Sequence, residues 1–139
     1  MQFERLDAAE VAAQWSDLAD ILAPSFELDP GTTAETALAE ILADDMTVFR
    51  VRDGADAVLL LSQGIAATGE RAVWVVHLGG KVEGGPKQRR AFMQQAVRSI
   101  EDMAREIGCD EVRMEGRVST WGRLFPDYQQ DGDVLRKAV

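Results

Sequence analysis

The hydrophobic pattern of the chain predicts four helices and six strands. The longest periodic stretch follows Pro86, where apolar residues recur at the i, i+3, i+4, i+7 spacing of a helix with one buried face. These residues are Phe92, Met93, Ala96, Val97, Ile100, Met103, Ala104 and Ile107. Pro86 suits the first helical turn and Gly108 suits a C-terminal stop. We therefore expect a long amphipathic helix between these two residues.

Three further helices are predicted from their boundary signals. Residues 8–22 follow a capping box formed by Asp7 and Glu10, and we expect Pro24 to end this helix. A second capping box at residues 32–35 opens a helix whose inward residues we expect to be Ala37, Leu38, Ile41 and Leu42. A short helix follows Ser119 or Thr120 and ends before Pro126.

The remaining apolar segments predict strands, at residues 1–6, 46–52, 57–65, 72–78, 112–117 and 134–139. The run at 72–78 is apolar nearly throughout, which indicates a central strand covered on both faces. Glycines at 79, 80, 84 and 85 predict a loop before the long helix. The order β-α-α-β-β-β-α-β-α-β predicts a single α/β domain over residues 1–139, with a central mixed, mostly antiparallel sheet flanked by helices.

Charge and composition narrow the function classes. The net charge of −9 argues against nucleic-acid binding, and no apolar run is long enough to cross a membrane. One cysteine and one histidine argue against a zinc site or any other metal site, so we expect none.

The positive charges are concentrated around the long helix. Residues 1–80 hold 4 Lys or Arg against 14 Asp or Glu, whereas residues 81–139 hold 11 against 10. Lys87, Arg89 and Arg90 stand at the start of the helix, where cations oppose the helix dipole. This arrangement favours an anionic partner, which is either a phosphate group or a carboxylate surface on a neighbouring subunit.

The order of elements, and residues 74–128 in more detail, resemble the GNAT superfamily of N-acetyltransferases. In that family a Gln/Arg-x-x-Gly-x-Gly/Ala loop and the following helix N-terminus bind the pyrophosphate of acetyl-CoA. The matching residues here are 88–93, in which Ala91 and Met93 replace the two small residues. If acetyl-CoA is bound, the resemblance implies the following contact residues: Leu78, Gly79, Gln88, Arg89, Arg90, Ala91 and Phe92.

The resemblance also identifies candidate catalytic residues. The family's later motif carries a tyrosine that often protonates the leaving thiolate, and Arg123 occupies that position here. Tyr128 lies five residues further on and is a weak candidate acid. The family's general base is often a strand carboxylate, but the strand at 72–78 offers only His77. His77 suits either a general base or a buried strand histidine bonded to the backbone.

Residues 116–128 also resemble small GNAT-like proteins of tailed phages and prophages. Trp121, Arg117 and Arg123 combine an aromatic ring with arginines, a frequent composition of interface anchors. We therefore expect a catalytically degenerate structural or assembly component that acts through protein partners or as a homo-oligomer. Its expected location is the cytoplasm or a phage virion. The alternatives are an acetyl-CoA-dependent N-acetyltransferase of an unknown amine and an acyl-CoA sensor without turnover.

Overall fold

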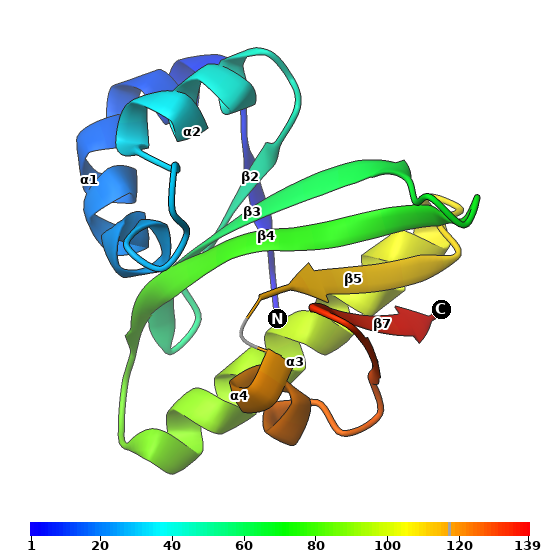
Figure 1. Cartoon of the computed structure of the whole chain (residues 1–139). Helices are drawn as coiled ribbons and strands as arrows, with labels where there is room; N and C mark the ends of the chain where they lie inside the picture. The colour runs from blue at the N-terminus through cyan, green and yellow to red at the C-terminus, as the bar shows by residue number, and fades with distance from the viewer. Residues whose placement is uncertain (117) are drawn as a thin grey trace. The chain divides into compact units, whose positions relative to one another are not determined.

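The computed structural model describes residues 1–116 and 118–139, and in these residues it contains seven strands and four helices (Figure 1). In chain order they are β1 (Glu4–Leu6), α1 (Ala8–Phe26), α2 (Ala34–Leu42), β2 (Thr47–Val51), β3 (Ala55–Ile65), β4 (Arg71–Val82), α3 (Pro86–Glu106), β5 (Glu111–Glu115), α4 (Val118–Leu124), β6 (Gln129–Asp131) and β7 (Val134–Ala138).

The strands form one mixed sheet in the order β1-β2-β3-β4-β5-β7-β6. Strands β4 and β5 pair in parallel, whereas β1/β2, β2/β3, β5/β7 and β6/β7 pair antiparallel. The parallel pairing joins Ala72–Val75 of β4 to residues 111–114 of β5, and β4 continues to Val82 beyond it. The structure therefore confirms the predicted mostly antiparallel α/β sheet, with β4 at its centre.

The chain divides into two compact units, and strands β3 and β4 contribute to both. The first unit comprises Met1–Ser62 and His77–Glu83, and the second comprises Gln63–Val76 and Gly84–Val139. The expectation that residues 1–139 form a single domain stays a prediction.

The first unit is built around helix α1. Asp7 and Glu10 form the predicted capping box, with Asp7 Oδ1 accepting from the Glu10 amide at 2.8 Å. Helix α1 contacts α2 and β1. Its apolar stripe joins a core with α2 and the first strands, whose fully buried members include Val11, Leu18, Leu22, Val58 and Leu60.

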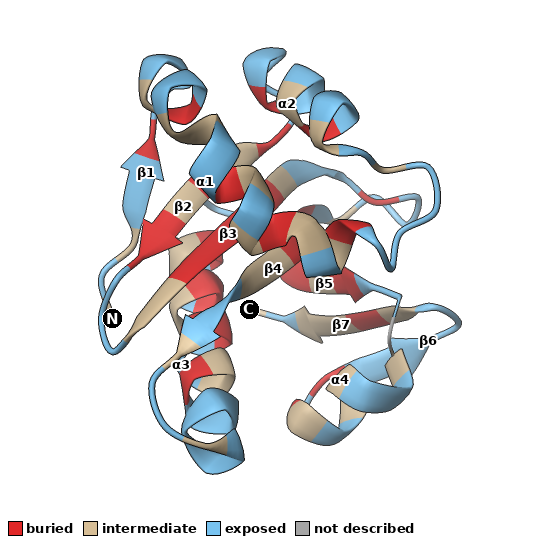
Figure 2. Cartoon of the chain, turned by 90° about the vertical axis from the view of Figure 1, so that its left-hand side faces the viewer, coloured by how far each residue is buried: buried red, intermediate tan, exposed pale blue. Residues whose placement is uncertain are grey.

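The second unit is built around helix α3, which contacts β5. Its buried apolar residues recur at the predicted helical spacing: Phe92, Ala96, Val97, Ile100 and Ala104. Val112 and Met114 of β5 are fully buried. Figure 2 shows this pattern as red segments along one part of α3, while the first turns of the helix are pale blue.

Some predicted helix boundaries are wrong. Pro24 lies inside α1, which runs on to Phe26, because a proline near a C-terminus removes only one backbone hydrogen bond of the last turn. The cap of α2 is Thr33 rather than Thr32, and its side chain accepts from the Thr36 amide at 3.1 Å. Leu42, expected inside, is 54% exposed because it lies at the end of the helix.

Strand β4 is longer than predicted and is less completely covered on its two faces. Gly79 and Gly80 belong to the strand rather than to a loop. Glycine is needed there because a Cβ atom on Gly79 would lie 2.4 Å from the Ile21 carbonyl oxygen of α1. Val76 is exposed, so the strand is not covered throughout on both faces. The sequence pattern also missed β6, a strand of three exposed polar residues.

Candidate functional site

His77, the candidate base, lies in the first unit on strand β4 and is 4% exposed. Its Nδ1 atom is 2.8 Å from Ser25 Oγ, and its Nε2 atom is 3.7 Å from Asp29 Oδ2. The imidazole ring of His77 and the phenyl ring of Phe26 pack edge-to-face, with their centroids 5.0 Å apart. Ser25 and Phe26 belong to the last turn of α1, so the helix end covers the histidine.

The surroundings of His77 determine what its ring can do. A carboxylate near Nε2 favours the tautomer that carries its proton there, and the Ser25 hydroxyl then donates to Nδ1. A proton taken up at Nδ1 has to displace the Ser25 hydrogen bond or pass through that hydroxyl. The arrangement stabilises the junction of α1 and β4 within the first unit, and it limits direct access to the imidazole.

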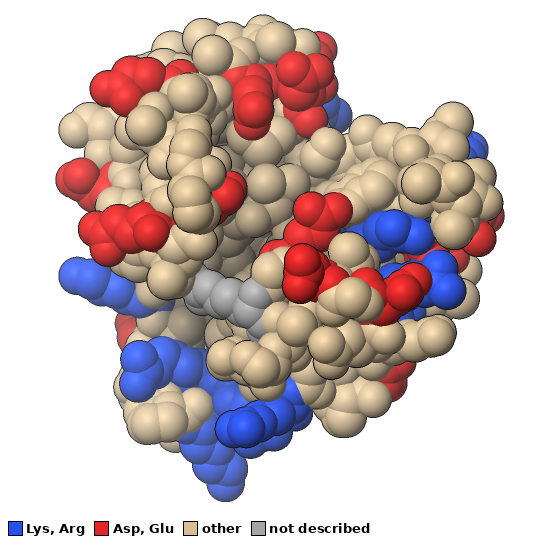
Figure 3. Space-filling model, viewed as in Figure 1, with Lys and Arg blue, Asp and Glu red and all other residues tan. Residues whose placement is uncertain are grey.

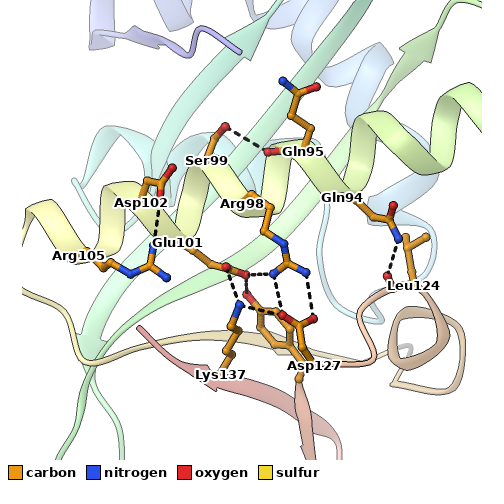
Figure 4. Close-up of polar contacts among 11 residues, drawn as sticks. Gln94, Gln95, Arg98, Ser99, Glu101, Asp102, Arg105, Leu124, Asp127 and Lys137 are labelled. Carbon is orange, nitrogen blue, oxygen red and sulfur yellow. Dashed lines mark hydrogen bonds and ion pairs between the residues drawn. The ribbon is translucent and has the colours of Figure 1, made fainter.

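Tyr128, the candidate acid, lies in the second unit and bonds to Glu101. Glu101 belongs to a network of charged groups with Arg98, Asp127 and Lys137 (Figure 4). The Tyr128 hydroxyl donates to Glu101 Oε2 at 2.8 Å, and both residues are buried. Lys137 Nζ donates to Glu101 Oε1 at 2.9 Å and pairs with Asp127 Oδ2 at 2.8 Å. Arg98 donates to Glu101 at 2.5 Å and to Asp127 at 3.0 Å. The network joins α3 to β7 and to the segment after α4.

This network opposes ionisation of the tyrosine. Burial and the hydrogen bond to Glu101 raise the pKa of Tyr128 far above its usual range. Burial raises the pKa of Asp127, but hydrogen bonds from Arg98 and Lys137 outweigh this effect and lower it to about 2. The hydrogen bond to Asp127 is the main cause that raises the pKa of Lys137. Tyr128 is therefore held as a neutral donor to an internal carboxylate.

The predicted phosphate-binding segment forms the first turns of α3. Pro86 has no amide hydrogen, and the Gly85 amide donates to Gln88 Oε1 at 2.9 Å. Helical geometry leaves the amides of Lys87 and Gln88 without an intrahelical acceptor, whereas the Arg89 amide already donates to the Gly85 carbonyl. Few backbone donors thus remain at this helix end.

The room next to these amides is also occupied. Gly84 has φ = +98°, and a Cβ atom there would lie 2.8 Å from Gln88 Cγ. The Gln88 side chain therefore fills the space beside Gly84 and Gly85. Lys87, Arg89 and Arg90 are exposed, and they match the charge of a pyrophosphate. The segment therefore supplies the positive charge that the pyrophosphate of coenzyme A requires, but few of the backbone amide donors.

The other predicted cofactor residues lie in different environments. Leu78 is half-buried on β4, and Gly79 packs against the α1 backbone. Ala91 is exposed on the second turn of α3, and Phe92 is buried. The amides of Ala91 and Phe92 lie within the helix and are used by its own hydrogen bonds. The role of all these residues in binding acetyl-CoA stays a prediction.

The predicted interface residues lie on or beside α4. Trp121 is half-buried, and its ring packs edge-to-face with that of Phe125 at a centroid distance of 6.4 Å. Arg123 is exposed in the last turn of α4. Arg117 lies outside the described residues. Their role in an interface stays a prediction.

No group of three or more potential metal ligands occurs among residues 1–116 and 118–139. Within the same residues, none of the helices has the length and apolarity that crossing a membrane requires. Cys109 is buried, and burial raises the pKa of its thiol, which disfavours the reactive thiolate.

Two residues that bond to the candidate catalytic groups, Glu101 and Ser25, were not predicted from the sequence. Glu101 lies one position after Ile100 on the buried side of α3, and a carboxylate on that stripe is the signal that could have identified it. Ser25 follows a proline at the end of α1, and no spacing in the sequence relates it to His77. Only the fold brings Ser25 to His77 and Glu101 to Tyr128.

Comparison with known proteins identifies the fold. No protein-family model and no curated protein sequence matches the chain. The chain is similar in structure to aminoglycoside 6′-acetyltransferase type Ii, with a TM-score of 0.62 and 12% identity over 99% of this chain and 97% of that one. It is also similar to a chain of the NatC complex bound to Gag peptide and CoA, with a TM-score of 0.59 and 13% identity over 97% of this chain and 94% of that one. The protein therefore has the GNAT fold that these acetyltransferases share.

Proposed function

We propose that this protein is a GNAT-fold component of a phage or prophage that acts through protein–protein contacts and does not transfer acetyl groups efficiently. The observation that carries the proposal is the burial of both candidate proton-transfer residues. His77 is 4% exposed beside Ser25, and Tyr128 is 6% exposed and bonded to Glu101. Each residue has a structural role within its own unit, and neither presents a free polar atom to a substrate.

The start of α3 supports the same proposal. The Gln88 side chain caps the helix, and the room beside Gly84 is filled. Met93, at the second small position of the family's loop, is half-buried in the second turn of α3. A pyrophosphate that relied on backbone amides here would have to displace Gln88.

The phage setting is supported by the resemblance of residues 116–128 to proteins of tailed phages and prophages. A location in the host cytoplasm or in the virion is compatible with that setting. The acidic composition suits a component that associates through specific charged contacts rather than through a large apolar face.

Calorimetry with acetyl-CoA and with CoA tests this function directly. We expect no binding at micromolar concentrations and no acetylated product by mass spectrometry with a panel of amines and peptides. The matched control is Arg5→Glu, which reverses an exposed cation on β1 outside the α3 segment and should give the same result as the wild type. Micromolar affinity together with turnover would overturn the proposal, and micromolar affinity without turnover would favour an acyl-CoA sensor.

An acetyl-CoA-dependent N-acetyltransferase is the second candidate, favoured by the exposed cations at the start of α3. Lys87, Arg89 and Arg90 suit an anionic cofactor, and the structurally similar chains belong to acetyltransferases. In such an enzyme His77 would accept the proton of the attacking amine through the Ser25 hydroxyl. Turnover by the wild type that is lost in folded His77→Gln, and reduced in Ser25→Ala, would select this candidate.

A further inference from the structure

Helix α3 begins with a basic segment in which every residue is exposed. Residues 86–91 are helical, and the first buried side chain is that of Phe92. Lys87, Arg89 and Arg90 make no ion pair or side-chain hydrogen bond with the described residues of the second unit. We call residues 86–91 the basic end. Figure 3 shows blue side chains gathered at the lower edge of the molecule, where Figure 1 places the start of α3.

The basic end is electrostatically unfavourable in an isolated chain. Cations at a helix N-terminus oppose the helix dipole, so each of these charges is unfavourable where it stands. The second unit has carboxylates of its own, yet none of them pairs with these three cations within residues 63–76, 84–116 and 118–139. A polar helix end of this kind gains stability from an anionic partner.

The first unit contains a segment in which anions stand at a helix C-terminus, where they are electrostatically unfavourable. Glu40 lies in the last turn of α2, and Asp44 and Asp45 follow that helix directly. Anions at a helix C-terminus also oppose the dipole. All three side chains are exposed, and none of them forms an ion pair with the described residues of the first unit. Leu42, between them, is 54% exposed. We call residues 40–45 the acidic end.

We propose that the basic end of one copy of this chain binds the acidic end of a second copy. The contact would place carboxylates near the N-terminus of α3 and cations near the C-terminus of α2, so that each helix dipole meets charges of the favourable sign. The aliphatic stems of Arg89 and Arg90 would cover Leu42. The inference rests on the proposed function, because it names the partner and the surface for the protein–protein contacts.

The two ends differ, so the contact joins unlike surfaces. Contacts of this type lead to closed rings or to open filaments, according to the rotation between neighbours. The net charge of −9 makes copies repel one another as a whole, and salt weakens both this repulsion and the local attraction. Charge reversal at each end is therefore a sharper test than the dependence of association on salt.

Sedimentation velocity of the full chain over a range of concentrations tests the proposal. We expect the wild type to associate, and we expect R89E/R90E and D44K/D45K each to weaken association by at least about tenfold, because each brings like charges together. An equimolar mixture of the two variants should recover association, since a native basic end can then meet a native acidic end. Recovery on mixing also shows that both variants are folded.

Two control variants make the same changes in net charge elsewhere. R5E/R71E reverses two exposed cations, and E4K/E106K reverses two exposed anions, all outside both ends. These controls should associate like the wild type. A monomeric wild type, association unaffected by reversal at the two ends, or an equal loss in the controls would overturn the inference. Because calorimetry with acetyl-CoA is a separate measurement, failure of this inference can be distinguished from failure of the proposed function.

Discussion

The hydroxyl group of Tyr128 donates a 2.8 Å hydrogen bond to Oε2 of Glu101, and both side chains are buried in the second unit. Tyr128 is the only tyrosine of the chain. Its hydroxyl is thus used to satisfy an internal carboxylate, in a fold whose enzymes frequently use a tyrosine as a proton donor. Lys137 is also close to the Tyr128 ring, with Nζ 5.9 Å from the ring centroid. These contacts predict a stabilising role that can be measured.

Tyr128→Phe should lower the free energy of unfolding by about 1.5–3 kcal/mol, because a hydrogen bond to a buried charged group is lost while the ring is kept. Urea denaturation measures this change. Lys137→Met removes a second donor to Glu101, and the double variant should deviate from additivity because both residues act on one carboxylate. If Tyr128→Phe abolished acetyl transfer and left stability unchanged, Tyr128 would instead be a proton donor.

Asp127 should make stability depend on acidic pH. Its folded-state pKa of about 2 lies below the ordinary 3.8 because of hydrogen bonds from Arg98 and Lys137, which outweigh burial. A depressed folded-state pKa contributes stability above the unfolded-state value, and that contribution disappears as pH falls through the folded-state value. Because the side chain is 39% exposed, we expect a modest effect.

Asp127→Asn isolates that effect from the titration of the other carboxylates. The wild type should be more stable than the variant at about pH 6, and the difference should shrink as pH falls from about 4 to about 2. Denaturant unfolding at a series of pH values gives both curves. A difference that stayed constant over this range would show that the ion pairs of Asp127 with Arg98 and Lys137 do not contribute.

The fold was largely predictable because its signals are local. Asp7 and Glu10 cap α1, and the apolar spacing from Phe92 to Ala104 identifies α3 and its buried face. The errors have tertiary causes. Gly79 belongs to β4 because α1 approaches it closely, which no property of the sequence near Gly79 reveals. Strand β6 contains only exposed polar residues and is defined by its pairing with β7.

The candidate site was less predictable because its contacts join distant parts of the chain. His77 was identified as a strand histidine, but its partner Ser25 lies 52 residues earlier. Tyr128 was identified from its place near the end of the family's motif, whereas its partner Glu101 lies on the predicted core face of α3. Sequence patterns could locate the polar groups, but only tertiary structure shows that they are already bonded.

Gly79→Ala should destabilise the first unit. The added methyl group would lie 2.4 Å from the Ile21 carbonyl oxygen, so α1 or β4 would have to move. We expect a loss of about 1–3 kcal/mol or more in the free energy of unfolding. Gly64→Ala is the matched control on β3, because its methyl group would lie 3.4 Å from the Trp74 ring, a contact that small side-chain shifts relieve. Equal stabilities of the two variants would contradict the close approach of α1.

Arg50 forms a second ionic cluster, which lies in the first unit. Arg50 is buried, whereas its carboxylate partners are exposed. The Arg50 side chain is 5% exposed, whereas those of Asp17 and Asp56 are 62% and 46% exposed. The guanidinium donates to Asp56 at 2.9 and 2.8 Å, to Asp17 at 2.7 Å and to Gln14 at 2.9 Å. The hydrogen bond from Arg50 also lowers the pKa of Asp56.

This inequality predicts opposite outcomes for removing the cation and removing the anions. Arg50→Met leaves two carboxylates that water can solvate, so we expect a change within about 1 kcal/mol, since an apolar residue of similar size can replace a buried ion without loss. Asp17→Ala/Asp56→Ala leaves a buried cation with only Gln14 as partner, and we expect a loss of about 3–5 kcal/mol. Urea denaturation of both variants compares them directly. A larger loss for Arg50→Met than for the double variant would show that the carboxylates, rather than the guanidinium, bear the cost of burial.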